Sequence, residues 1–462
     1  MDYIENRTYD ELAVGDEARV QRTLSHKDIR LFAAMSGDVN PVHLDEEFVR
    51  SSVFQEVIGH GMWGGSMIST VLGTQLPGPG TIYLSQTFKF LKPVKVGDRL
   101  DVCVRVLEKQ DKSRVLFDCV CSNQDDEPVL TGEALVIAPT QKVKRRRADD
   151  PRAFVHEDGD RLKALVERAR DGEPLRTGVV HPVKKVVLEG IAGAVEKNLI
   201  VPVLIGPRAK IEVAAAEAGF SLDGVEIVEA PHSHAAAETA TALARKGAVG
   251  ALMKGALHTD EIMGAVVNRQ SGIRTERRLS HIYVMDTPAY KKLLFISDAA
   301  INIQPGLQDK CDITQNAIDL ARALGVETPK TAILSAVETV YPKMQSTLDA
   351  ASLCKMADRG QITGGVLDGP LAFDNAISEM AAAAKGISSP VAGDADILIV
   401  PDLEAGNMLA KELDYLAGAV AAGIVLGAQV PIILTSRAEG EAARVAASAV
   451  AKLFANREPK LR

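Results

Sequence analysis

Three residues in the N-terminal third could together move a proton: Asp38, Asn40 and His43, in the segment MSGDVNPVHLDEEF. Asp, Asn and Pro all favour bends, so this segment predicts a turn that lets Asp38 and His43 point into the same space. A carboxylate and an imidazole that share one water can place a proton on one carbon and a hydroxyl on its neighbour. The alternative is an Asx turn with a surface histidine, and the residues alone leave both interpretations open.

A glycine-rich segment downstream offers a complementary group. His60 and Gly61 lead directly into a predicted helix over 61–73, GMWGGSMISTVLG. The Gly61 N–H would be one of the first-turn donors that have no partner within a helix. Such a donor, aided by the helix dipole, suits a thioester carbonyl oxygen that acquires enolate charge. Ser69 lies further along the same helix.

Further polar residues follow apolar segments in the C-terminal two thirds. Ser436 and Arg437 come directly after the apolar run PIILT, and the segment SGIRTERR contains Arg274 and Arg277. Open α/β sheets bind ligands where strands end and helices begin, and the guanidinium fork matches phosphate oxygens. The alternative for each arginine is a solvated or ion-paired side chain.

Two histidines, His232 and His234, could form part of a metal site. They lie in a Pro/Ser loop, and no third ligand is obvious near them. Metal sites in proteins generally need three or four protein ligands. We therefore predict no metal site.

The elements that position these residues change in character near residue 140. Before it, segments alternate between apolar and polar residues, which predicts half-buried antiparallel strands interrupted by one helix, an α+β pattern. After about residue 155, Ala-rich helices alternate with short apolar strands. That alternation predicts a mostly parallel sheet with helices on both faces, in two lobes around a cleft. The expected strands are 81–90, 99–109, 113–123, 202–206, 250–254, 292–297, 331–335, 396–401 and 430–436, and the expected helices 313–324, 346–359, 372–384 and 407–416.

Two other segments have competing interpretations. The basic run QKVKRRR is followed by Asp149 and Asp150, and we interpret it as a solvated linker rather than a nucleic-acid patch. The stretch 415–436 carries no charge and has the length of a membrane span. It is mostly Ala, Gly and Val, with no flanking aromatic belt. We expect a buried helix, a turn at Gly427 and a buried strand.

The composition excludes several classes of protein. The chain has 462 residues, 46% apolar and 25% charged, which excludes a mainly disordered chain. A net charge of −8 and 4% aromatic residues disfavour nucleic-acid binding. The five cysteines form no CxxC pair, and the start MDYIENRTYDE is unlike a signal peptide. Both features favour a cytoplasmic location.

The N-terminal segment resembles the MaoC-like (R)-specific enoyl-CoA hydratases over roughly residues 10–138. The resemblance rests on SGDVNPVHLDEEF, GHGM, the IS within SMIST, and LPGPGTIYLSQTFKFLKPVKVGD. It implies a hot-dog fold, in which an antiparallel sheet wraps a long helix, usually as a dimer. It places the catalytic pair on Asp38 and His43, the oxyanion glycine on Gly61 and the supporting serine on Ser69. We assign Asn40 to substrate binding.

From about His181 to the end, the chain resembles the phosphate acetyl/butyryltransferases, with details nearer the butyryl branch. The resemblance rests on GPLAFDNAIS, SPVAGDADILIVPDLEAGNMLAK and PIILTSRAEG. It implies two α/β lobes and a coenzyme A thioester in their cleft. It places the active-site pair on Ser436 and Arg437. Ala443 stands where the acetyl branch has an aspartate base, which leaves the base unassigned. The residues we expect to bind substrate are Arg274, Arg277, Asn407 and Lys411.

We therefore predict a multidomain chain: an α+β hot-dog domain (1–140), a charged linker (141–155) and a two-lobed α/β domain (156–462). The predicted enzyme hydrates trans-2-enoyl-CoA and transfers a short acyl group from CoA to inorganic phosphate. The alternative is a phosphate acyltransferase that carries a non-catalytic hot-dog module for acyl-CoA binding or dimerisation. We expect the substrates to be small molecules and the chain to form a homo-oligomer. We expect neither a bound cofactor nor a nucleic-acid or membrane partner.

Overall fold

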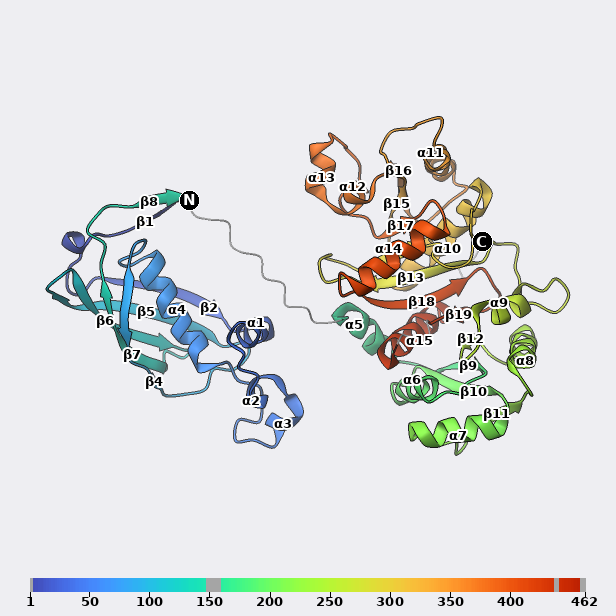
Figure 1. The fold of residues 1–462 in the computed structure, drawn as a ribbon, viewed down its shortest axis with the longest axis horizontal. Helices are drawn as coiled ribbons and strands as arrows, with labels where there is room; N and C mark the ends of the chain where they lie inside the picture. Colours follow the sequence, from blue (N-terminus) through green and yellow to red (C-terminus); the bar gives the residue numbers. More distant parts are fainter. Residues whose placement is uncertain (1–2, 147–158, 436–439, 458–462) are drawn as a thin grey trace. The chain divides into compact units, whose positions relative to one another are not determined.

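The computed structural model describes residues 3–146, 159–435 and 440–457. The chain divides into two compact units, residues 1–155 and 156–462 (Figure 1). Ser436 and Arg437, and residues 147–155 of the expected linker, lie outside the described residues. No helix in the described ranges has both the length and the apolar character that a membrane crossing requires. All five cysteines are unpaired.

An antiparallel sheet and one long helix form the first unit, which confirms the α+β hot-dog arrangement. The six-stranded sheet has the order β2-β5-β6-β7-β3, with β4 also paired to β7. The helix α4 (Gly61–Thr74) packs against β5. The strands are β2 (Glu17–Thr23), β3 (Ile82–Gln86), β4 (Lys89–Phe90), β5 (Arg99–Gln110), β6 (Arg114–Ser122) and β7 (Pro128–Ile137).

Alternation along β5 and β6 creates the core of this unit. Every second side chain is buried from Leu100 to Val106 on β5 and from Val115 to Cys121 on β6, while those between are partly or fully exposed. The buried face meets the apolar side of α4, where Ile68, Val71 and Leu72 are inaccessible to solvent. The apolar face of the alternating strands and the apolar face of α4 therefore pack together into one core.

Short helices join β2 to α4: α1 (His26–Ser36), α2 (Pro41–Leu44) and α3 (Glu46–Arg50). Two further pieces lie near the ends of the unit. A 3-10 turn spans Tyr9–Glu11, and β1 (Tyr3–Glu5) pairs with β8 (Lys144–Arg146). The first unit thus includes residues 144–146 of the expected linker. Lys142 forms ion pairs with Glu5 and Glu11, as a solvated basic run would.

The second unit is built on one eleven-stranded sheet of order β11-β10-β9-β12-β19-β18-β13-β14-β17-β15-β16. Seven of these ten pairings are parallel, which confirms the mostly parallel prediction. The three antiparallel pairings around β18 and β13 separate two parallel blocks. The strands are β9 (Leu175–Val180), β10 (Ile200–Gly206), β11 (Glu226–Glu229), β12 (Ala251–Lys254), β13 (Ser280–Asp286), β14 (Leu294–Ser297), β15 (Lys330–Leu334), β16 (Val366–Leu371), β17 (Ile397–Ile399), β18 (Val420–Leu426) and β19 (Ile432–Ile433).

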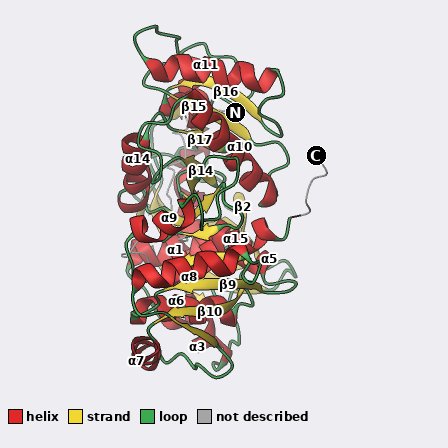
Figure 2. Ribbon diagram, turned by 90° about the vertical axis from the view of Figure 1, so that its right-hand side faces the viewer, coloured by secondary structure: helices red, strands yellow, loops and turns green. Residues whose placement is uncertain are grey.

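Helices cover both faces of this sheet, as predicted. On β17, Ile397 and Ile399 belong to the core that includes α10, whereas Leu398 belongs to the core that includes α14. Figure 2 shows these two helices on opposite sides of β14 and β17. The helices are α5 (Asp160–Ala169), α6 (Lys185–Glu196), α7 (Arg208–Ala218), α8 (Ser233–Arg245), α9 (Thr259–Val267), α10 (Leu307–Ala323), α11 (Gln345–Asp358), α12 (Phe373–Ile377), α13 (Glu379–Ala384), α14 (Leu403–Tyr415) and α15 (Glu441–Ala455).

Two predicted helices differ from the structure. The uncharged stretch that starts at Tyr415 forms the strand β18 and not a helix; the turn at Gly427 (φ +94°) and the following strand are confirmed. β18 is a central strand, so its apolar run is buried on both faces and shows no helical period. The helix expected over 372–384 is divided at Ser378, whose extended backbone ends α12 and whose hydroxyl caps α13.

Candidate active site

The end of α1 places Asp38. Gly37 adopts the left-handed conformation (φ +75°) that ends the helix. The Asp38 carboxylate accepts a hydrogen bond from the Asn40 N–H (3.2 Å), and the Asn40 side chain accepts one from the Val42 N–H (3.3 Å). The Asx turn is therefore present, and it positions Asp38 and His43. Asn40 caps α2, so its amide oxygen is used within the turn.

His43 is held in one tautomer. Its Nδ1 lies 2.8 Å from the carbonyl oxygen of Ile58. A carbonyl can only accept, so Nδ1 carries the proton and Nε2 keeps a free lone pair. Burial lowers the pKa of His43 below its usual value, and the nearby His60 lowers it further. The Ile58 carbonyl and Asp38 act in the opposite direction. A histidine with a pKa below its usual value is mostly neutral at pH 7.

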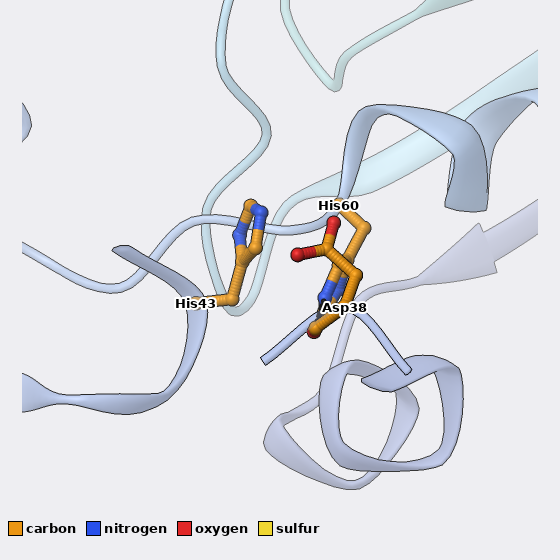
Figure 3. Close-up of side chains that lie close together, drawn as sticks. All are labelled: Asp38, His43 and His60. Atoms are coloured by element: carbon orange, nitrogen blue, oxygen red, sulfur yellow. Dashed lines mark hydrogen bonds between the residues drawn. The ribbon is translucent and has the colours of Figure 1, made fainter. Parts of the chain in front are cut away.

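His60 is a third member of the site that sequence reasoning did not assign. The residue is 4% exposed, and its Nε2 lies 3.0 Å from the Asp38 carbonyl oxygen. Its ring lies 3.9 Å from that of His43, centroid to centroid, with 30° between the planes. Figure 3 shows the three side chains pointing toward one another. The segment GHGM contained the residue, but no spacing rule linked it to Asp38.

The same three residues bring their ligating atoms within 4.8 Å of one another, the one such group in the described part of the chain. Each ring places one nitrogen on a backbone carbonyl oxygen, an arrangement found for acid–base and for metal-binding histidines alike. The cluster is therefore a donor set for proton transfer or for a metal ion. His232 and His234 do not form a metal site with a third described ligand: His232 caps α8 and His234 lies 3.1 Å from Glu261.

A cavity of about 300 Å³ opens beside the cluster. His43, His60 and Gly61 lie on its wall with a largely apolar lining. Gly61 is the first residue of α4, and a Cβ at this position would lie 2.8 Å from the Phe90 ring. A side chain at this position would therefore press on Phe90, which also lines the cavity. Ser69 is exposed and is not among the lining residues of this single chain. The apolar lining includes Trp63, Leu100, Val129 and Leu130.

A second cavity of about 350 Å³ lies in the C-terminal unit, at the start of α15. Lys411 and Asp414 of α14 line it, together with Tyr283, Gly440 and Ala443. Gly440 is the first described residue after 436–439. Of the four residues expected to bind substrate in this unit, Lys411 lines this cavity.

The other three predicted binding residues lie elsewhere. The Asn407 amide donates to the Ala299 carbonyl oxygen (3.2 Å), and Arg277 forms an ion pair with Asp319 (2.5 Å). Arg274 forms an isolated bridge with Ala428, just after the turn at Gly427, and it is not among the residues that line the cavity with Lys411.

Lys254 is a further residue that sequence reasoning missed. It ends β12, is 4% exposed, and its ammonium donates to the Thr435 carbonyl oxygen (3.4 Å). Thr435 is the residue before Ser436. The sequence signal that could have revealed it is a lysine at the end of the apolar segment GALM.

Comparisons with known proteins match both units. Residues 232–452 match the family described as "Phosphate acetyl/butaryl transferase", and residues 13–118 match the "MaoC like domain". A phosphate acetyltransferase of Rhizobium meliloti is 59% identical over 293 residues, which are 63% of this chain and 93% of that protein. A phosphate butyryltransferase of Clostridium acetobutylicum is 39% identical over 291 residues, which are 63% of this chain and 97% of that protein. The expected closeness to the butyryl branch is wrong by this measure.

Two solved structures are also similar. A branched-chain phosphotransacylase from Enterococcus faecalis matches with a TM-score of 0.55 and 28% identity, covering 62% of this chain and 100% of that one. The R-hydratase PhaJ1 from Pseudomonas aeruginosa is 44% identical and covers 33% of this chain and 99% of that one, with a TM-score of 0.33.

Proposed function

We propose that this chain, which belongs to the phosphate acetyl/butyryl transferase family and also carries a MaoC-like domain, catalyses two reactions of acyl-CoA thioesters. It is an enzyme with an acyltransferase unit and a hydratase unit. Coenzyme A thioesters and phosphate are the substrates that these families imply. The residues named below, their roles and the acyl chain length are our assignments.

The N-terminal unit adds water to a trans-2-enoyl-CoA through Asp38 and His43. One water donates hydrogen bonds to the carboxylate and to the free Nε2 of His43. The pair takes one proton from this water while the water oxygen bonds to C3 of the enoyl group and the C2=C3 double bond opens to an enolate. The pair then delivers that same proton to C2, which returns it to its starting state. The Gly61 N–H stabilises the thioester oxygen while it carries enolate charge.

The observation that carries this assignment is the position of the neutral His43 beside Asp38 and an apolar cavity. An Asp and a His that only formed a surface turn would not need an apolar space of acyl size next to them. We assign Ser69 a supporting role and Asn40 a role in ordering the turn. The apolar lining excludes water from the acyl chain.

The C-terminal unit transfers the acyl group to phosphate. We assign Arg437 to binding and orienting phosphate, and Ser436 to donating to the tetrahedral oxyanion. A phosphate oxygen attacks the thioester carbonyl carbon, the C–S bond breaks, and the CoA sulfur takes the proton that hydrogen phosphate loses. We assign Lys411 to substrate binding because it lines the cavity at the start of α15. Arg274, Arg277 and Asn407 do not line that cavity.

Two assays on one preparation test this function. Hydration of crotonyl-CoA is followed beside phosphate-dependent CoA release from acetyl-CoA and butyryl-CoA. We expect His43→Gln to abolish hydration alone, and Ser436→Ala and Arg437→Ala to abolish CoA release alone. The ratio of the two release rates determines the chain-length preference.

The other function to exclude is a phosphate acyltransferase with a non-catalytic hot-dog module. If His43→Gln and Asp38→Asn hydrated crotonyl-CoA at the full rate, the assignment of these two residues would be refuted. If the unaltered chain did not hydrate crotonyl-CoA, the hot-dog module would be non-catalytic. A homo-oligomer, a cytoplasmic location and the absence of a bound cofactor stay predictions. Light scattering during gel filtration tests the first of them.

A further inference from the structure

We propose that His60 is a positioning residue for hydration, which fixes the Asp38 turn and the His43 ring relative to the first turn of α4. The inference rests on the proposed hydratase function. Asp38 and His43 belong to the segment between α1 and α3, whereas Gly61 belongs to α4. His60 directly precedes Gly61 and contacts both acid–base residues.

The first contact is a directional hydrogen bond. Because the Asp38 carbonyl oxygen can only accept, His60 Nε2 carries a proton and donates it across 3.0 Å. Nδ1 is buried and has no hydrogen-bond partner among the described residues. Within the described structure, the bond to Asp38 is therefore what fixes the ring rotation of His60. It anchors the backbone of a residue that otherwise lies in an exposed turn.

The second kind of contact is between rings. The His60 ring contacts that of Phe32, at 5.0 Å between centroids, and that of His43, at 3.9 Å, with both pairs tilted. Phe32 belongs to α1 and His43 to α2. One side chain thus joins the two helices that flank the turn to the start of α4. Hydration needs the carboxylate, the imidazole and the Gly61 N–H to meet one substrate, and an error of about 1 Å can cost 100-fold in rate.

The experiment separates the two contacts with two variants of the full chain. His60→Gln keeps an amide that can donate toward Asp38 but removes the ring, whereas His60→Phe keeps a ring and removes the donor. His26→Gln and His26→Phe serve as matched controls, because His26 is an exposed histidine of the same unit. Crotonyl-CoA hydration is measured as kcat and KM over pH, with Trp63 fluorescence to verify folding.

We expect both His60 variants to lose about 10- to 100-fold in kcat. KM should change much less, because the apolar lining is retained. We also expect the acidic limb of the rate profile to move to higher pH, since His60 contributes to keeping the pKa of His43 low. A residue with a merely structural role would not move that limb. The controls should match the unaltered chain.

Unchanged kcat and an unchanged acidic limb in both folded variants would overturn the inference. Asp38→Asn and His43→Gln, measured in parallel, distinguish this from failure of the hydratase assignment. If those two lose hydration while the His60 variants keep it, only the role of His60 is refuted. If those two keep hydration, the hydratase assignment itself fails. If His60→Phe does not fold, kcat and the acidic limb of His60→Gln alone test the role of His60.

Discussion

At the scale of single residues, a hydrogen bond on one ring nitrogen determines what the other nitrogen can do. The Ile58 carbonyl holds the proton of His43 on Nδ1, which leaves the Nε2 lone pair for the base role that we propose. Burial lowers the pKa of His43, so the ring stays neutral at lower pH than an exposed histidine would. Both effects favour the proposed role.

This state of His43 predicts the pH dependence of hydration. The base is active when neutral, so the rate is present above its pKa and is lost as pH falls through it. Because that pKa is lowered from 6.5, we expect the acidic limb of kcat/KM for crotonyl-CoA to lie below pH 6.5. His43→Gln should show no such limb in any residual rate. An acidic limb at or above pH 6.5 would contradict the assignment of His43 as the neutral base.

A buried histidine in the other unit links pH to stability instead. His281 on β13 is inaccessible to solvent, and burial lowers its pKa to about 4, while the backbone of Leu434 partly offsets this effect. Gly423 leaves the space that its ring needs. The unfolded chain binds this proton more readily than the folded chain, so the stabilisation is present above pH 6.5 and is lost as pH falls toward 4.

We therefore expect acid destabilisation of the C-terminal unit by up to about 3 kcal/mol between pH 6.5 and 4 from this residue. Urea unfolding followed by circular dichroism at pH 7 and pH 5 measures it. His281→Asn should unfold more easily at pH 7 but show a smaller difference between the two pH values. An equal difference in both proteins would assign the acid sensitivity to other groups.

At the scale of elements, the sequence predicted the helices and strands that show a periodic pattern of apolar residues. It did not predict the strand that is buried on both faces. The helix expected over 61–73 is α4, and the alternating segments are β5 and β6. The apolar run of β18 was misassigned because a strand buried on both faces has no alternation to recognise.

In the candidate site, the sequence likewise predicted the residues that a local turn brings together and missed the one that tertiary packing brings in. Asp38 and His43 were predicted because a local turn brings them together. His60 was not, because it lies 22 residues from Asp38 and is brought there by the packing of α4. Arg274 was expected to bind substrate because arginine suits phosphate, but it lies beside Ala428 and is not among the residues that line the cavity with Lys411.

Close packing of elements predicts opposite effects for two glycines of the first unit. Gly132 on β7 packs closely against Thr87, which lies between β3 and β4. A Cβ at Gly132 would lie 1.8 Å from the Thr87 carbonyl oxygen. Gly73 is in α4 and would meet nothing within 4 Å. We expect Gly132→Ala to destabilise the unit by more than about 2 kcal/mol, and Gly73→Ala to stabilise it by about 0.5–1 kcal/mol.

Thermal unfolding followed by tryptophan fluorescence tests both substitutions. Trp63 is the one tryptophan of the chain and is buried in α4, so its signal reports on the first unit alone. A Gly132→Ala midpoint equal to that of the unaltered chain would show that the strands can separate at no cost. CoA release should be unchanged in both variants, because Gly132 and Gly73 lie in the other unit.

At the scale of the whole molecule, the two units are self-contained. One hydrophobic cluster belongs to the first unit and three others to the second, and no described residue is shared between the two sets. The sheets are also separate, since no strand of one pairs with a strand of the other in the described ranges. Each unit therefore buries its own core and satisfies its own strand pairings, as an independently folding domain does.

This organisation predicts that the two activities can be separated by expressing residues 1–155 and 156–462 as two proteins. We expect the first fragment to hydrate crotonyl-CoA and the second to release CoA with phosphate, each within about twofold of the full chain, because each retains its complete core. Mixing the fragments should change neither rate. Circular dichroism establishes whether each fragment is folded. A folded fragment that has lost its activity would show that its site needs the other unit, and the full rate would then have to return on mixing.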